Sequence, residues 1–389
     1  MQLILPNDQG ALQTYRLTHA SSPFVAVQPA RWNRSAYAAA HVVVDPLQHC
    51  DPWDGPPAID WEATLRFREH LWRLGFKVAE AMDTAQRGMG LDWPGARELI
   101  RRSIAHAKTI PGADLACGVG TDQLVADERT TIADVLHAYQ GQIEAVEAAG
   151  GRIILMASRA LAAVAKSADD YRRVYGELLR QTKERVVLHW LGEMFDPALK
   201  GYWGTNDIAA AMDTVLDIVR AHANKIEGIK ISLLDAKWEV AMRPKLPAGV
   251  IMFTGDDFNY DTLIAGDGKH HSHALLGIFD PIAQVAAAAL GKLASGDAAG
   301  YKNTIAPTIP LSREIFRAPT RHYKAGVIFI AWLNGHQSHF VAAGGLQSAR
   351  SVGHYVQVFK LADQCGALSD PELAVARMRS FLQVHAGIS

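Results

Sequence analysis

One lysine stands inside an apolar run whose other residues suit burial. Lys230 lies in Glu227–Leu233, a segment with the composition of a strand. Burial disfavours the ammonium form and so lowers the pKa of a lysine. A neutral amine can attack a carbonyl carbon to form a Schiff base, whose protonated form draws electrons for C–C cleavage, aldol addition or dehydration. The alternative is a strand-end lysine whose amine reaches solvent or pairs with Asp235 or Glu80.

A histidine stands near the end of the preceding apolar run. His189 lies in Arg185–Trp190, next in chain order to the run that holds Lys230. Imidazole titrates near neutral pH, so His189 is a candidate for moving protons to and from an imine, with Glu193 assisting it. A half-buried histidine that bonds a backbone carbonyl is the commoner case and remains the alternative.

Two adjacent carboxylates follow the seventh apolar run, where residues 254–257 read Thr-Gly-Asp-Asp. Asp256 and Asp257 are expected to bind substrate hydroxyls, and a metal ion is the other ligand that such a pair suits. One of them is expected to cap a helix that begins near Phe258. We expect Asp256 to be the one that is freer to face the site.

Three polar residues follow the second apolar run. Thr84, with its backbone N–H at the start of a helical turn, is a candidate for binding an anionic substrate group. The carboxylates of Glu80 and Asp83 are candidates for accepting hydrogen bonds from substrate hydroxyls. Ordinary capping of a loop is the alternative with about equal weight.

The sequence contains one cluster of histidines, in the segment 269–273, which reads Lys-His-His-Ser-His. His271 and His273 share a face if the segment is extended, and could bind a metal with Glu80, Asp83 or Asp256. The cluster precedes the last apolar run, however, at the end opposite to the expected site. This position favours a structural or surface role, and no metal is expected there.

Eight short apolar runs alternate with longer amphipathic stretches and must position these side chains. The runs are Ala38–Val44, Phe76–Met82, Ala113–Val119, Gly151–Met156, Arg185–Trp190, Glu227–Leu233, Gly249–Thr254 and His273–Phe279. Alternating strands and helices predict a parallel sheet, and eight units predict a closed (β/α)₈ barrel. No Gly-x-Gly-x-x-Gly follows the first run, which weakens a dinucleotide-binding fold. Active sites of such barrels lie at the carboxyl ends of the strands, where the candidate residues stand.

The flanking segments have other patterns. Residues 1–35 begin with a predicted hairpin, which could plug the bottom of the barrel or form an oligomer contact. The barrel is expected over residues 36–296. Residues 297–389 read as several helices, with breaks near Pro307–Pro310, Pro319 and Gly344-Gly345.

Composition narrows the class of protein. The chain has 389 residues, 49% of them hydrophobic, and a net charge of −1, so nothing indicates nucleic-acid binding. Cys50, Cys117 and Cys365 are widely spaced, which argues against a disulfide framework or a cysteine zinc site. The amino terminus lacks a signal-peptide pattern, and no apolar run is long enough to span a bilayer. We expect a cytoplasmic protein that acts on a small molecule.

Several motifs, taken in order over about residues 36–300, resemble the dihydrodipicolinate synthase/N-acetylneuraminate lyase superfamily of class I aldolases. Gly228–Lys230 reads Gly-Ile-Lys, as in the sixth strand of that family, and Thr254–Asp257 is similar to its Ser-Gly-Asp-Asp. Gly118–Gly120 matches its Gly-Val-Gly, while Val44–Pro46 and Ala58–Asp60 are similar to its first strand and loop. The resemblance implies a (β/α)₈ barrel, a Schiff-base lysine at Lys230, no cofactor and a homo-oligomer, either a dimer or a tetramer.

The chain departs from that family at two motifs. The family's Gly-Thr-Thr-Gly-Glu, whose threonines bind the substrate carboxylate, corresponds to Met82–Gln86, where Thr84 remains and Asp83 replaces its neighbour. His189 stands where the family has a proton-relaying tyrosine. The sequence therefore predicts a Schiff-base lyase, aldolase or dehydratase acting on a sugar-derived keto compound or keto acid. The alternatives are a metal-dependent sugar isomerase or class II aldolase, with ligands Glu80, His189, Glu193 and Asp256, and a non-catalytic barrel that binds a metabolite.

Overall fold

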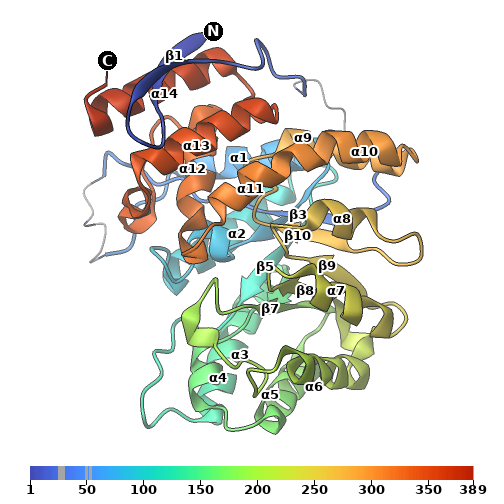
Figure 1. The fold of residues 1–389 in the computed structure, drawn as a ribbon. Coiled ribbons are helices and arrows are strands. Elements are labelled where there is room, and N and C mark those ends of the chain that lie inside the picture. Colours follow the sequence, from blue (N-terminus) through green and yellow to red (C-terminus); the bar gives the residue numbers. More distant parts are fainter. Residues whose placement is uncertain (25–30, 49–50, 52–54, 389) are drawn as a thin grey trace.

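A closed barrel of eight parallel strands forms the centre of the chain (Figure 1). The structure is a computed structural model that describes residues 1–24, 31–48, 51 and 55–388. Hydrogen-bonded neighbours follow the order β10-β3-β4-β5-β6-β7-β8-β9. The strands are β3 (Ala36–Ala39), β4 (Lys77–Glu80), β5 (Leu115–Val119), β6 (Arg152–Leu155), β7 (Val186–Leu191), β8 (Ile226–Ser232), β9 (Ile251–Thr254) and β10 (His273–Leu276). The predicted (β/α)₈ class is confirmed, and each predicted run contributes one barrel strand.

Helices surround the barrel and continue beyond its last strand. Those that follow the strands are α1 (Trp61–Leu74), α2 (Trp93–Ala107), α3 (Ile132–Ala149), α4 (Arg159–Val164), α5 (Ala168–Gln181), α6 (Ile208–Ala221), α7 (Ala236–Met242), α8 (Tyr260–Ala265) and α9 (Ala283–Ala294). The carboxyl-terminal helices are α10 (Ala298–Ile305), α11 (Ile309–Ile315), α12 (Tyr323–Leu333), α13 (Val352–Gln364) and α14 (Pro371–Ala386). The side chains of Thr131 and Asp134 form a capping box at the start of α3.

The strand residues alternate between the barrel interior and the surrounding helix layer. The interior cluster consists of Tyr37, Ala39, Ala79, Met82, Ala116, Ile154, Val187, Phe253 and Leu275. Three members of this cluster are alanines, on β3, β4 and β5, and the largest are Tyr37 on β3 and Phe253 on β9. At the amino-terminal end of the strands, Arg152 donates hydrogen bonds to the Tyr37 hydroxyl and to Asp114, each at 2.7 Å. These groups lie at the bottom of the barrel, whereas the residues that line a cavity lie at the carboxyl end of the strands.

The carboxyl-terminal helices and the amino-terminal hairpin pack together on one side of the barrel (Figure 1). The hairpin consists of β1 (Gln2–Pro6) and β2 (Leu12–Arg16), and it contacts α13 and α14 rather than the bottom of the barrel. The Tyr15 hydroxyl donates a hydrogen bond to Asp363 at 2.7 Å, and Arg379 donates one to the carbonyl of Gln2. Every residue of α12 is buried. This helix lies in the interior of the protein, and its first turn contacts the turn after β4.

The structure also bears on the expectations about membrane-spanning segments and cysteines. Among the helices in the described part of the chain, none has the length and hydropathy needed to cross a membrane. Cys117 and Cys365 are buried free thiols, and Cys50 lies outside the described residues.

Candidate active site

Lys230 points into the barrel. Its strand neighbours Ile229 and Ile231 belong to the core between the strands and the helices, so alternation turns the lysine inward. In the sheet, Lys230 is opposite His189 on β7 and Phe253 on β9. The amine therefore faces the carboxyl-terminal half of the barrel interior, and within the described residues it pairs with neither Asp235 nor Glu80.

A small inner cavity of about 10 Å³ surrounds this amine. Its walls are Ala39, Met82, Asp83, Thr84, Leu191, Phe195, Lys230, Ser232, Asp257, Gly277 and Tyr323. Burial lowers the pKa of Lys230, while the negative charges of Asp83 and Asp257 oppose that shift. Within the described residues, the amine donates no hydrogen bond and forms no ion pair, which leaves it available to a ligand.

Two glycines allow the walls of the inner cavity to approach one another. A Cβ atom on Gly255 would lie 2.2 Å from the Ser232 hydroxyl oxygen and 2.6 Å from Cε of Lys230. A Cβ atom on Gly277 would lie 3.1 Å from the Phe316 ring and 3.3 Å from the Thr84 hydroxyl oxygen. Contacts below about 3 Å force neighbouring atoms to move in a close-packed interior. Gly255 is therefore part of what positions the lysine.

The two aspartates after β9 have roles opposite to those expected. Asp256 accepts hydrogen bonds from the backbone N–H groups of Phe258 and Asn259, at 2.9 and 3.2 Å, and caps the turn before α8. Asp257 lines the inner cavity and accepts the backbone N–H of Ile278 at 2.9 Å. The expectation that Asp256 faces the site was wrong, because two backbone donors and the Asn259 amide hold its carboxylate in the turn.

Asp257 titrates close to neutral pH. Burial raises the pKa of its carboxyl group to about 7, against the opposing effects of the Ile278 hydrogen bond and the positive charge of Lys230. A carboxyl group with a pKa near 7 can accept or release a proton at physiological pH.

His189 is fully buried beside Lys230. Its Nε2 lies 3.3 Å from the Ser232 hydroxyl, while its Nδ1 is buried without a hydrogen-bond partner among the described residues. Burial and the nearby charge of Lys230 lower the pKa of His189 well below its ordinary value. The ring is therefore neutral in the unliganded site, and it has one nitrogen with unused hydrogen-bonding capacity. The alternative of a histidine bonded to a backbone carbonyl is not observed.

Tyr323, at the start of α12, completes the inner cavity. Its hydroxyl lies 2.8 Å from that of Thr84, and its ring stacks on Phe316 with centroids 4.3 Å apart. Burial, together with the negative charges of Asp83 and Asp257, raises the pKa of Tyr323 well above its ordinary value. The phenol therefore keeps its proton. Sequence analysis did not identify Tyr323, because one tyrosine at the start of an apolar helix resembles an ordinary core residue.

A second buried lysine follows Tyr323 in the sequence. Burial lowers the pKa of Lys324 to about 8, and the charges of Asp83 and Asp196 oppose that shift. Its amine donates a hydrogen bond to the Arg321 carbonyl at 3.2 Å and lies 3.4 Å from the Met89 sulfur. Lys324 lies near Asp83 but does not line the inner cavity.

A large outer cleft of about 680 Å³ adjoins the inner cavity, and Asp83 and Leu191 line both. His189 forms another part of the cleft wall. Hydroxyl and charged groups farther out include the Thr121–Ser158 pair at 2.5 Å, the Arg159–Asp196 ion pair at 2.5 Å and the Arg87–Asp122 ion pair at 2.6 Å. The volume suits a small organic molecule whose inner end reaches Lys230.

Comparison with a known family covers nearly the whole chain. A sequence model described as "Protein of unknown function (DUF993)" matches residues 3–388. The chain belongs to this family. A comparison of this DUF993 protein with curated protein sequences gave no match.

Solved structures share the fold of this DUF993 protein at low sequence identity. Dihydrodipicolinate synthase from Oceanobacillus iheyensis is 12% identical, with a TM-score of 0.61 over 84% of this chain and 95% of the synthase. The enzyme from Bacteroides thetaiotaomicron is 13% identical, with a TM-score of 0.62 over 85% and 99%. YagE of E. coli K12, a prophage protein of the same family solved with pyruvate, is 16% identical, with a TM-score of 0.61 over 90% and 98%. The predicted resemblance to this superfamily is confirmed at the level of the fold.

Two predicted site residues lie away from both cavities of the DUF993 protein. Glu80 is fully buried on the outer side of β4, where Arg68 of α1 donates two hydrogen bonds to it at 2.8 and 2.9 Å. Burial favours a raised pKa for Glu80, but the charge and hydrogen bonds of Arg68 outweigh it and the pKa is lowered. Glu193 is exposed on the turn after β7. Neither lines the inner cavity or the outer cleft, so the geometry gives no support to the predictions that they contact substrate or assist His189.

The residues named as ligands in the metal-dependent alternatives do not lie together in the structure. Within the described part of the chain, no three His, Cys, Asp or Glu side chains are arranged to hold a metal ion. Glu80 points away from His189, and Asp256 is occupied by its turn. At the other end of the barrel, Nδ1 of His273 accepts the backbone N–H of Ser35 at 2.7 Å, which is the structural role expected for that histidine.

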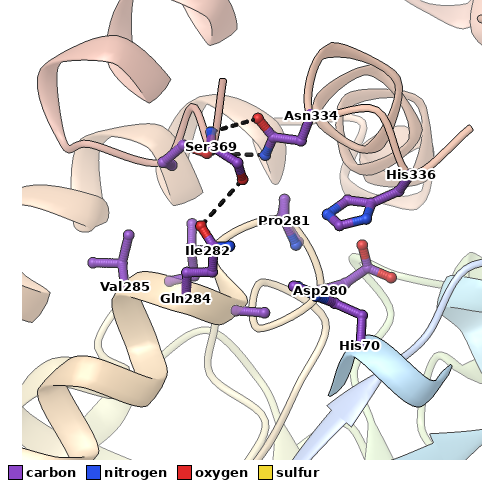
Figure 2. Close-up of a pocket in the computed structure, with 11 residues that line it drawn as sticks. His70, Asp280, Pro281, Ile282, Gln284, Val285, Asn334, His336 and Ser369 are labelled. Atoms are coloured by element: carbon purple, nitrogen blue, oxygen red, sulfur yellow. Dashed lines mark hydrogen bonds between the residues drawn. The ribbon is translucent and has the colours of Figure 1, made fainter. Parts of the chain in front are cut away.

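A second small cavity lies between the barrel and the carboxyl-terminal helices (Figure 2). Figure 2 shows His336 and Asp280 facing it, and Ser369 joined to Asn334 and to Gln284 by hydrogen bonds of 2.9 and 3.1 Å. His70 from α1 lies with its ring centroid 4.6 Å from that of His336. These contacts attach the helices to the barrel, away from Lys230.

Proposed function

We propose that the protein is a Schiff-base-forming lyase, aldolase or dehydratase that acts on a sugar-derived keto compound or keto acid. The observation that carries the proposal is the buried amine of Lys230, which has no partner among the described residues and lines a small cavity next to the outer cleft. The fold shared with dihydrodipicolinate synthases supports it as an analogy.

Formation of the imine uses the electrostatics of the inner cavity. The neutral amine of Lys230 attacks the carbonyl carbon, and the carbinolamine then loses water to give a protonated imine. Burial favours the neutral nucleophile. The carboxylates of Asp83 and Asp257 stabilise the positive charge of the imine once it has formed. The same cavity therefore favours both the attacking form and the product of the step.

Two neutral groups beside the amine are placed to move protons. His189 has an unpaired buried nitrogen, and Tyr323 has a phenolic proton within hydrogen-bond distance of Thr84. The Tyr323 hydroxyl supplies the proton that leaves with the carbinolamine oxygen as water, and the neutral His189 ring is available to accept a proton. In an aldol cleavage, a base then takes the proton of the β-hydroxyl group, the Cα–Cβ electrons move to the imine nitrogen, and an aldehyde leaves. Protonation of the resulting enamine at carbon and addition of water release the ketone and restore the amine.

The size of the inner cavity restricts which part of a substrate enters it. About 10 Å³ corresponds to a single water molecule, so only the carbonyl group and its nearest atoms can approach Lys230. Leu191 and Asp83, which separate the two spaces, must shift as the carbonyl enters. The remainder of the substrate lies in the outer cleft.

Borohydride trapping tests the proposal. Reduction of the imine by hydride gives a stable secondary amine, and mass analysis of peptides identifies the modified lysine. The expected adduct is on Lys230 and is absent from the Lys230→Ala variant. Lys324 is the matched internal control, because it is also buried and has a lowered pKa. An adduct on Lys324, or no ketone-dependent adduct together with intact turnover in Lys230→Ala, would refute the mechanism.

A further inference from the structure

Asp83 is the carboxylate at the boundary between the inner cavity and the outer cleft. It lies in a helical turn over Asp83–Ala85, directly after β4, and is partly buried. Its charge raises the pKa of Lys230, Lys324 and Tyr323 alike, so it lies close to all three. Among the described residues its carboxylate accepts no hydrogen bond and forms no ion pair, unlike the carboxylates of Asp122, Asp196, Asp256 and Asp257.

The outer cleft carries an excess of negative charge. Its described walls contain the carboxylates of Asp83, Asp92, Asp122 and Asp196 against the guanidinium groups of Arg87 and Arg159. Arg87 is paired with Asp122 and Arg159 with Asp196, which leaves Asp83 and Asp92. Asp92 caps α2 by accepting the backbone N–H of Gly95. Asp83 is therefore the carboxylate whose acceptor capacity remains for a ligand.

We propose that Asp83 selects the substrate, which is an uncharged hydroxyketone with a hydroxyl-bearing carbon beside its carbonyl, and that it excludes 2-keto acids. The inference rests on imine formation at Lys230. The carbons attached to the imine carbon lie within two bonds of the lysine nitrogen, and hence beside the carboxylates that flank it. A hydroxyl group there donates a hydrogen bond to Asp83.

A carboxylate in the same place has the opposite effect. A 2-keto acid brings a negative charge next to Asp83 in a buried space, where like charges repel strongly and no described cation other than the reacting amine lines the inner cavity. The polar groups farther out suit hydroxyls as well. The hydroxyl groups of Thr121 and Ser158 lie on the cleft wall and carry no charge. The lining of the outer cleft thus suits the same uncharged, hydroxyl-bearing substrate that Asp83 selects.

Trapping with three small ketones tests the inference at pH 7.5. The probes are dihydroxyacetone, pyruvate and dihydroxyacetone phosphate, each with borohydride, and adducts are counted on the Lys230 peptide with Lys230→Ala as background. We expect initial trapping of dihydroxyacetone to exceed that of either anion by roughly tenfold or more. Asp83→Asn, which removes the charge but keeps the shape, is expected to lower the dihydroxyacetone-to-pyruvate ratio by roughly tenfold. Asp83→Thr is expected to raise trapping of pyruvate.

The outcomes separate this inference from the proposed function. Asp213→Asn, an exposed change on α6, is the control and leaves the ratio unchanged. Preference of the wild type for pyruvate or for the phosphate, or an unchanged ratio in folded Asp83→Asn, overturns selection by Asp83 while leaving the Schiff base intact. Absence of every adduct on Lys230 overturns the proposed function, and the inference with it. Thermal unfolding of each variant establishes that it is folded.

Discussion

Replacement of Gly255 by alanine tests whether close packing positions the lysine. The added Cβ atom would lie 2.2 Å from the Ser232 hydroxyl oxygen, 2.6 Å from Cε of Lys230 and 2.8 Å from the Ile231 carbonyl oxygen. The Ser232 hydroxyl can rotate away, but the carbonyl belongs to the backbone of β8. Relief of the overlap therefore requires movement of the lysine side chain or of the strand itself.

The magnitude follows from these contacts. An acceptable carbon–carbon contact is about 3.4 Å or longer, so Cε of Lys230 must move by roughly 1 Å. A displacement of that size at a reacting group costs about 100-fold in rate. Overpacking of a buried site also costs about 1–3 kcal/mol of unfolding free energy. Gly255→Ala should therefore show both a slower reaction at Lys230 and a lower stability.

The assay combines borohydride trapping of dihydroxyacetone on Lys230 with denaturant unfolding. Gly141→Ala is the matched control, because a Cβ atom there meets no atom within 4 Å and Gly141 lies within α3. The control is expected to keep the trapping rate and to gain up to about 1 kcal/mol of stability. Wild-type trapping and stability in Gly255→Ala would show that Lys230 is not held by this contact.

Two further predictions concern Tyr323 and His70. Tyr323→Phe removes the hydroxyl next to Thr84. It should slow deuterium exchange at the carbons of dihydroxyacetone by about 100-fold, with a smaller loss of imine trapping. Equal loss in both assays would argue against a role of Tyr323 in proton transfer. Burial lowers the pKa of His70 to about 4, below its value of about 6.5 in an unfolded chain. As the pH falls, His70 therefore becomes protonated at a higher pH in the unfolded chain than in the folded protein. The free energy of unfolding should fall by up to ~3 kcal/mol as pH decreases from about 6.5 to about 4. Urea unfolding at several pH values measures this, and the same pH dependence in His70→Gln would contradict the assignment to His70.

The barrel was predictable because the same pattern, an apolar strand followed by an amphipathic helix, is repeated along the sequence. Eight β-prone runs with amphipathic segments between them leave few arrangements other than a closed parallel barrel, and the position of Lys230 follows from that fold. Its inward direction did not follow from the run itself, since the residues around it are apolar on both faces. Only the register of β8 against β7 and β9 decides that Ile229 and Ile231 face the helices.

The site was harder to predict where a side chain has a choice of partners. Sequence spacing put Glu80 at the end of a strand, but strand alternation turns it outward to Arg68, which lies twelve residues earlier on α1. Asp256 and Asp257 are adjacent, and the choice of which one caps the turn depends on its backbone N–H donors. Tyr323 enters the cavity from α12 through tertiary packing, which no local pattern encodes. Asp83 and Thr84, in contrast, lie at the cavity as their place after β4 indicated.

The contribution of α12 to the inner cavity has a consequence for how the protein is made. A ribosome completes all eight barrel strands before it synthesises Tyr323, which lies 93 residues beyond Lys230 in the printed sequence. Until α12 docks, the wall that Tyr323 provides is absent and water reaches the lysine. The environment that lowers the pKa of Lys230 is therefore complete only after α12 has been made and packed. Reactivity at Lys230 is therefore a direct report that the last helices have reached their places.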